Sequence, residues 1–224
     1  MKYIASVSFG KDSTAMLIKI LENHYPLDCV VFYDTGMEFD IIYKYRDWWK
    51  NNLKENGIEF VELHPTMPFI KKMVAYPHQS RDGKIKLGYG WCGGLCRWGT
   101  TEKVRTINNY CKDAHQYVGI AYDEEKRHER LNGTNKSSPI YDLKLTESDC
   151  LKICYDHGFD YNGLYEHLDR VSCWCCRNKN LREISNYKKC MPYYYKKLVE
   201  LEKLIGEPMK KPYTLIERFG DVDD

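Results

Sequence analysis

The chain has 224 residues, 43% of them hydrophobic, and its 34 Lys and Arg against 32 Asp and Glu give a formal net charge of +2. This length suits one domain or one and a half with a core that needs no disulfides. The sequence has no 18-residue apolar run and no signal-peptide pattern, so we expect a cytoplasmic protein without a membrane segment.

Strand and helix patterns alternate along the first 120 residues. Strands are predicted at Tyr3–Val7, Asp28–Tyr33, Ile58–Leu63 and Gln116–Ile120. Helices are predicted at Ser13–Asn23, Glu38–Asn56 and Thr101–Lys112. This alternation predicts an α/β fold with a doubly wound, mainly parallel sheet, and ligands are expected outside the carboxyl ends of its strands.

The later part of the chain has a different pattern. Residues 76–91 are rich in Gly and charge, and we expect a long loop there that serves as a substrate lid or rim. A capping-box start is predicted at Thr146, followed by helices at Leu181–Lys189 and Pro192–Ile205 and a frayed tail at Glu217–Asp224. We therefore expect a nucleotide-binding domain over residues 1–145 and a helical C-terminal region over 146–224.

A phosphate-binding pattern follows the first predicted strand. It reads Ser8-Phe9-Gly10-Lys11-Asp12-Ser13 and opens a helix. The glycine allows close backbone approach, the lysine adds a positive charge, the serines add donors, and the helix N-terminus attracts anions. The ordinary ATPase loop is excluded because Ala5 and Asp12 replace residues that it requires.

This pattern resembles the pyrophosphate loop of the PP-loop superfamily, and further segments resemble its phosphoadenosine phosphosulfate (PAPS) reductase-like branch. Residues 34–38 are similar to the family's Asp-Thr-Gly-x-Glu motif, and residues 119–127 partly match a second motif, with Ala121 and Glu125 as departures. The likeness spans roughly residues 3–180. It implies an adenine nucleotide alpha hydrolase-like, Rossmann-type fold. The nucleotide contacts it implies are Ser8, Gly10, Lys11, Asp12, Ser13, Asp34, Thr35, Gly36, Glu38, Gly119, Asp123 and Arg127.

Five of the ten cysteines stand in two tight clusters about eighty residues apart. Their spacing predicts a four-thiolate site made by Cys92, Cys96, Cys173 and Cys176, with Cys175 as a competitor. Such a site would bind Zn²⁺ or an iron–sulfur cluster, and sulfur ligands alone do not choose between them. Clustering of this kind favours metal or redox chemistry over a secreted disulfide framework.

The leading hypothesis is an ATP α-phosphate hydrolase and adenylyltransferase linked to sulfur transfer. Lys11 and Asp12 would be catalytic, Mg²⁺ would accompany ATP, and the acceptor would be a nucleic acid or a small molecule. A second hypothesis is a sulfonucleotide reductase or sulfotransferase-type enzyme. Sulfonucleotide reductases of the family carry a late Glu-Cys-Gly-Leu-His segment, which we do not find after Cys190.

A third hypothesis is a nucleotide-binding module without catalysis, held together by the metal site. The basic segment at residues 177–211 would then be the surface that contacts a protein partner.

Overall fold

The structure, a computed structural model, describes residues 1–221, apart from the side chains at positions 97 and 98. Contacts divide the chain into two compact units that are interleaved along the sequence. The first unit comprises Met1–Asp34, Phe39–His64 and Lys103–Asn162. The second comprises Thr35–Glu38, Pro65–Glu102 and the described residues from Gly163 onward. The expected division near residue 145 falls within the last segment of the first unit.

The first unit is built on a five-stranded sheet in which every neighbouring pair of strands is parallel. Its strands, in spatial order, are β3 (Glu59–Leu63), β2 (Cys29–Tyr33), β1 (Lys2–Val7), β6 (Ala114–Val118) and β7 (Lys136–Ser137). The strand order reverses between β1 and β6, which is where doubly wound sheets bind ligands. The predicted fold class is confirmed, although the two-residue β7 has no signal in the sequence.

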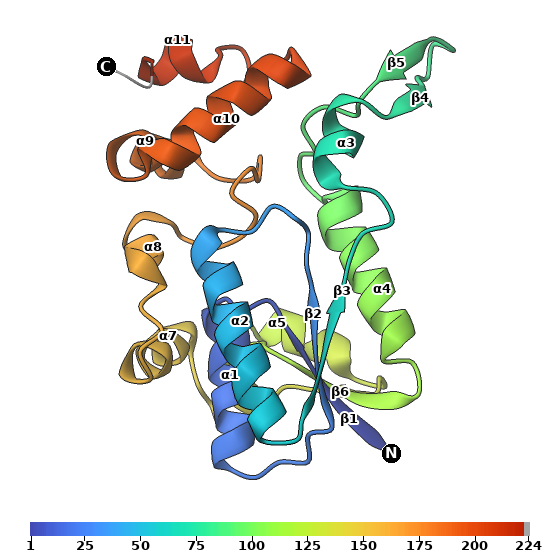
Figure 1. Ribbon diagram of the computed structural model, residues 1–224, viewed down its shortest axis with the longest axis vertical. Helices are drawn as coiled ribbons and strands as arrows, with labels where there is room; N and C mark the ends of the chain where they lie inside the picture. The colour runs from blue at the N-terminus through green and yellow to red at the C-terminus, as the bar shows by residue number, and fades with distance from the viewer. Residues whose placement is uncertain (222–224) are drawn as a thin grey trace. The chain divides into compact units, whose positions relative to one another are not determined.

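Helices cover both faces of this sheet (Figure 1). They are α1 (Lys11–Glu22), α2 (Asp40–Glu55), α4 (Glu102–Tyr110), α5 (Glu125–His128), α6 (Pro139–Asp142) and α7 (Glu147–Asp156), with short 3-10 turns at Glu129–Leu131 and Tyr161–Gly163. On one face, Ile4, Val31 and Tyr33 pack against Ile107 and Cys111, at the end of α4 and just beyond it. Helix α7 packs on α1. Apolar burial on both faces holds the strand ends in fixed positions.

The second unit contains most of the C-terminal helical region. Its elements are α3 (Phe69–Val74), strands β4 (Pro77–Gln79) and β5 (Ile85–Leu87), a π-helical turn at Arg97–Thr101, α8 (Leu164–His167), α9 (Leu181–Cys190), α10 (Pro192–Ile205) and α11 (Leu215–Phe219). Helix α10 packs against α9, α11 and α3. The buried carboxylate of Glu202 accepts hydrogen bonds from the backbone N–H groups of Met209 and Leu215, at 2.6 and 2.7 Å, and so fixes the turn that leads to α11.

Two expectations about irregular segments are corrected. The expected loop at residues 76–91 contains the antiparallel pair β4–β5, whose three-residue strands are too short to show a period of two. Glu217–Phe219, expected to be frayed, belong to α11, because Thr214 and Glu217 form a capping box at its start. The last three residues of that expected tail, 222–224, lie outside the described residues. Among the described residues, no helix combines the length and apolar character needed to cross a bilayer.

Candidate functional site

The turn between β1 and α1 has the backbone shape of an anion-binding loop. Phe9 adopts a left-handed conformation, with φ of 55°, and its buried ring lies 5.2 Å from that of Phe32. Gly10 is the N-cap of α1, and no side chain caps the helix. The amides of the first helical turn and the positive end of the helix dipole therefore face the loop, as phosphate binding requires.

Lys11 lies in the first turn of α1 and is 8% exposed. Its Nζ is 2.7 Å from Oδ1 of Asp12 and 2.6 Å from Oε2 of Glu147, which begins α7. Burial lowers the pKa of Lys11, but the two carboxylates outweigh it and the pKa lies above its ordinary value. The lysine is therefore positively charged at neutral pH.

Asp12 is surrounded by more negative charge than Lys11 neutralises. Burial raises the pKa of the Asp12 carboxyl, Lys11 lowers it, and Glu147 and Glu124 raise it further, so that the net shift is upward. Lys11 thus contacts two carboxylates, and Glu124, which pairs with Arg127, is a third nearby. This excess of negative charge beside a phosphate loop suits a site where a divalent cation accompanies the phosphates.

Ser8, Ser13 and Gly119 fix the shape of the loop. The Ser13 hydroxyl oxygen accepts from the Ser8 backbone N–H and donates to the Gly10 carbonyl, each at 3.1 Å. Gly119 follows β6 and packs directly on the start of α1, since a Cβ there would lie 2.9 Å from the Ser13 backbone nitrogen. The structure therefore gives Gly119 a packing role, in that only glycine permits this backbone approach.

Asp123 is connected to the loop at residues 8–13 by its contact with Glu147, whereas Arg127 is not. The Asp123 carboxylate accepts from the backbone N–H of Glu147 at 3.1 Å, and Glu147 is the residue whose carboxylate pairs with Lys11. Arg127 is ion-paired with Glu124, and about half of its side chain is exposed. The structure brings Asp123 to the loop through Glu147 and leaves Arg127 on the surface.

The motif at residues 34–38 spans the boundary between the two units. Asp34 directly follows β2, and its Oδ1 accepts from the Tyr43 hydroxyl at 2.8 Å. Gly36 has φ of +73°, and the Thr35 hydroxyl donates to Glu38 at 2.9 Å. Gly36 therefore satisfies the left-handed conformation that this turn requires.

Residues 35–38 lie against the second cysteine cluster within the second unit. The Trp174 backbone N–H donates to the Met37 carbonyl at 2.9 Å, and the Thr35 hydroxyl is 3.6 Å from the Cys173 sulfur. In the sequence, the motif at residues 34–38 and the second cysteine cluster are far apart. The fold joins them.

The two cysteine loops are tied to each other by one side chain. The Asn178 amide donates to the Gly94 carbonyl at 2.8 Å and accepts from the Gly94 N–H at 3.1 Å. Cys96 Sγ accepts from the Gly99 N–H at 3.1 Å. Segments eighty residues apart therefore lie side by side. Among the residues that the structure describes, however, no three of the sulfurs of Cys92, Cys96, Cys173 and Cys176 lie within 4.8 Å of one another.

Cys175 and Lys179 are the most buried polar groups of the second cysteine loop. Cys175 is 7% exposed, and burial raises the pKa of its thiol. Lys179 is 3% exposed, and burial lowers the pKa of its ammonium group against the opposing effects of Glu183, Cys176 and Cys173. The tetrad with Cys175 as its competitor remains a prediction.

Sequence reasoning assigned no site role to Glu147, Lys179, Glu62 or His64. Glu147 lies within the span of roughly residues 3–180 that resembles the family, but only the packing of α7 on α1 brings it to Lys11. Glu62 and His64 had a usable signal, because they are two residues apart at the carboxyl end of a predicted strand. Lys179 had none.

Two comparisons place the chain among known proteins. The family model described as "Phosphoadenosine phosphosulfate reductase domain" matches residues 2–179. The chain is also similar to an uncharacterised protein of Methanocaldococcus jannaschii, with 27% identity over 207 residues. That alignment covers 87% of this chain and 40% of the relative, so the chain spans less than half of that protein's length.

Proposed function

The chain belongs to the phosphoadenosine phosphosulfate reductase domain family, and we propose that it is a nucleotide-binding enzyme of the sulfonucleotide-related type. We propose that its nucleotide is ATP, that it cleaves the bond between the α- and β-phosphates, and that it transfers the adenylyl group to an acceptor during sulfur transfer. The acceptor is a nucleic acid or a small molecule.

The observation that carries this proposal is the charge arrangement at Lys11. The ammonium group contacts Asp12 and Glu147, and Glu124 is near enough to raise the pKa of Asp12. Bare phosphates would be repelled by this excess of carboxylates, whereas a phosphate chain that carries Mg²⁺ would be attracted. Asp12 and Glu147 are the residues that would hold the ion, which supplies neutralisation of phosphate charge when bound.

The chain's own residues would position the phosphates. The amides at the start of α1 and the hydroxyls of Ser8 and Ser13 donate to phosphate oxygens, and Lys11 stabilises the charge that develops on the leaving pyrophosphate. Positioning and electrostatics would then account for most of the rate.

The link to sulfur transfer is supported by the cysteine loops. Residues 35–38, which continue the nucleotide motif, contact Cys173 and Trp174. A four-cysteine site would hold zinc or an iron–sulfur cluster there, and a cluster supplies a place for sulfur to bind. The basic segment at residues 177–211 would serve an acceptor or a protein partner.

The test compares Lys11→Met with Lys19→Met, a matched change on the same helix. Lys19 pairs with Glu22 at 2.7 Å and is remote from the loop. Loss of charge-assisted contacts predicts a fall in ATP affinity of about 10- to 100-fold for Lys11→Met and no change for the control, measured by calorimetry with Mg²⁺. Formation of AMP and pyrophosphate supports α-phosphate cleavage, and formation of ADP contradicts it.

The second candidate is an enzyme that acts on a sulfonucleotide, which the family description favours. The same calorimetry distinguishes the two candidates. Tighter binding of PAPS than of ATP, without a requirement for Mg²⁺, would replace the first proposal with this one. Binding of either nucleotide without any turnover would instead support a module that lacks catalysis.

A further inference from the structure

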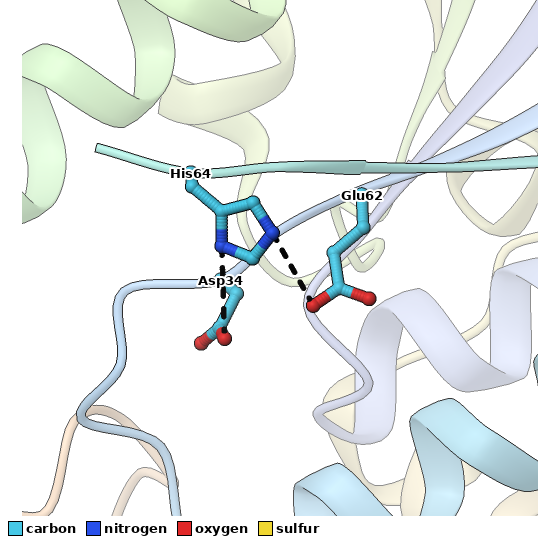
Figure 2. A group of neighbouring side chains, drawn as sticks. All are labelled: Asp34, Glu62 and His64. Atoms are coloured by element: carbon cyan, nitrogen blue, oxygen red, sulfur yellow. Dashed lines mark ion pairs between the residues drawn. The ribbon is translucent and has the colours of Figure 1, made fainter. Parts of the chain in front are cut away.

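Three potential metal ligands meet at the carboxyl ends of β2 and β3. Asp34, Glu62 and His64 each offer a ligand atom, and these atoms lie within 4.8 Å of one another. Figure 2 shows the His64 ring between the two carboxylates. All three residues belong to the first unit, and none of them is part of the cluster around Lys11.

The sheet register places these side chains together. Phe32 pairs with Glu62 and Tyr33 with Leu63, and the Asp34 backbone N–H continues the ladder with a 2.8 Å bond to the Leu63 carbonyl. Asp34 is thus opposite His64. Since side chains on one face recur every two residues, Asp34, Glu62 and His64 share the face that α2 covers. The pairing of the β2 and β3 backbones therefore fixes the positions from which these three side chains extend.

The imidazole is close to both carboxylates without being hydrogen-bonded to them. His64 Nδ1 lies 3.9 Å from Asp34 Oδ2, and Nε2 lies 3.6 Å from Glu62 Oε1, both longer than a hydrogen bond. The His64 side chain is 59% exposed, whereas those of Asp34 and Glu62 are 14% and 22% exposed. The carboxylates are therefore held in place, and the imidazole has room to turn one nitrogen toward an ion from solvent.

Neighbouring residues on α2 orient the carboxylates and leave negative charge in excess. Tyr43 donates to Asp34 at 2.8 Å, and Arg46 Nη1 donates to Glu62 at 3.2 Å. Arg46 also contacts Asp47 at 2.9 Å. One guanidinium is therefore shared between two carboxylates. Hydrogen bonds such as those from Tyr43 and Arg46 orient metal ligands.

We propose that Asp34, Glu62 and His64 form a binding site for a divalent first-row transition ion. Two carboxylates with one imidazole make a mixed oxygen and nitrogen set, which suits Mn²⁺ or Zn²⁺ better than the all-oxygen preference of Mg²⁺. The proposed site uses no cysteine and no residue of the loop at residues 8–13, so it stands whether or not ATP is the nucleotide.

The experiment titrates nucleotide-free, full-length protein with Mn²⁺ and follows the free ion by electron paramagnetic resonance. Mn²⁺ is the chosen probe because thiolates select softer ions. We expect one ion bound per chain, with affinity reduced roughly tenfold or more in His64→Gln and in Glu62→Gln. His64 is exposed enough that its substitution should not disturb folding, which circular dichroism checks.

Two variants separate this site from other carboxylates. Glu59→Gln removes the same charge from the same strand, on the face opposite to Glu62, and should leave Mn²⁺ affinity unchanged. Asp12→Asn identifies any Mn²⁺ that is held at the phosphate loop instead. The proposal is overturned if the protein binds no Mn²⁺, if the ion persists in both His64→Gln and Glu62→Gln, or if only Asp12→Asn releases it.

Discussion

At the scale of single residues, we propose that the loop at residues 8–13 serves ligand binding at a cost in stability. Lys11, Asp12 and Glu147 share a partly buried site in which negative charge exceeds positive charge before any ligand is present. Residues held in such a site are usually suboptimal for folding, because their arrangement serves a ligand that arrives later.

The Asp12 carboxyl gives a prediction with a definite sign. Its pKa is raised in the folded state by burial and by Glu147 and Glu124, so the folded state binds this proton more tightly than the unfolded state does. As pH rises through that raised pKa, the folded state loses stability. Asp12→Asn should therefore increase the free energy of unfolding at pH 7 by about 0.5 to 1 kcal/mol.

Urea unfolding without nucleotide measures this effect. The gain should shrink toward pH 3, where the wild-type carboxyl is protonated. Asp156→Asn is the matched control, because Asp156 is exposed and pairs with Lys152 along α7. A loss of stability in Asp12→Asn at pH 7 would show that the pair with Lys11 outweighs the crowding of carboxylates.

At the scale of elements, α7 delivers Glu147 to the loop. Thr146 accepts from the Asp149 N–H, and Asp149 accepts from the Thr146 N–H, which confirms the predicted capping box. The helix then packs its buried Cys150 and Cys154 toward α1, and the Cys154 thiol donates to the Lys11 carbonyl at 3.2 Å. The cap therefore fixes the start of α7, where Glu147, the partner of Lys11, is the first helical residue.

Thr146→Ala should lower the free energy of unfolding by about 1 kcal/mol, because it leaves an N-terminal amide of α7 without its acceptor. Ser148→Ala, at an exposed position in the same turn, is the control and should change little. Chemical denaturation gives the difference, and hydrogen exchange at the start of α7 locates it. Equal stability of the two variants would contradict a role for the cap.

Short elements show where sequence patterns stop being informative. The long helices and strands β1, β2, β3 and β6 have enough turns or alternations to be recognised, and their predicted bounds agree with the structure to within a few residues. Strands β4, β5 and β7 have two or three residues each, and they form only because the backbone of a neighbouring strand pairs with them. Helix α11 also depends on the buried Glu202, whose hydrogen bond from the Leu215 N–H is visible only in three dimensions.

At the scale of the molecule, the interleaving of the two units decides which motifs meet. Residues Thr35–Glu38 belong to the second unit, where Thr35 lies beside Cys173. Asn178 joins the second cysteine loop to Gly94 of the first cysteine loop. The chain thus assembles its cysteine region from three distant segments. This arrangement favours a shared ligand over separate structural cysteines.

Cys92→Ser should reduce the metal content of anaerobically purified protein by at least about half, because one of four predicted thiolates is lost. Cys190→Ser is the matched control, since Cys190 is exposed at the end of α9 and belongs to neither cluster. Elemental analysis for iron and zinc, with a visible spectrum, measures both. Wild-type protein free of both metals would refute the four-cysteine site.

The sequence by itself determined the doubly wound sheet, the loop at Ser8–Ser13, the cap at Thr146 and the family likeness. Each of these depends on local spacing: period-two and helical patterns, a glycine beside a lysine, or a threonine three residues before an acid. Residues a few positions apart are enough to define them.

Only the tertiary structure decided that Glu147 pairs with Lys11, that Asn178 joins the cysteine loops, and that Asp34 is opposite His64. These contacts join residues 30 to 136 positions apart, and their existence depends on strand register and helix packing. No local pattern encodes such a distance, because burial of the whole core selects it.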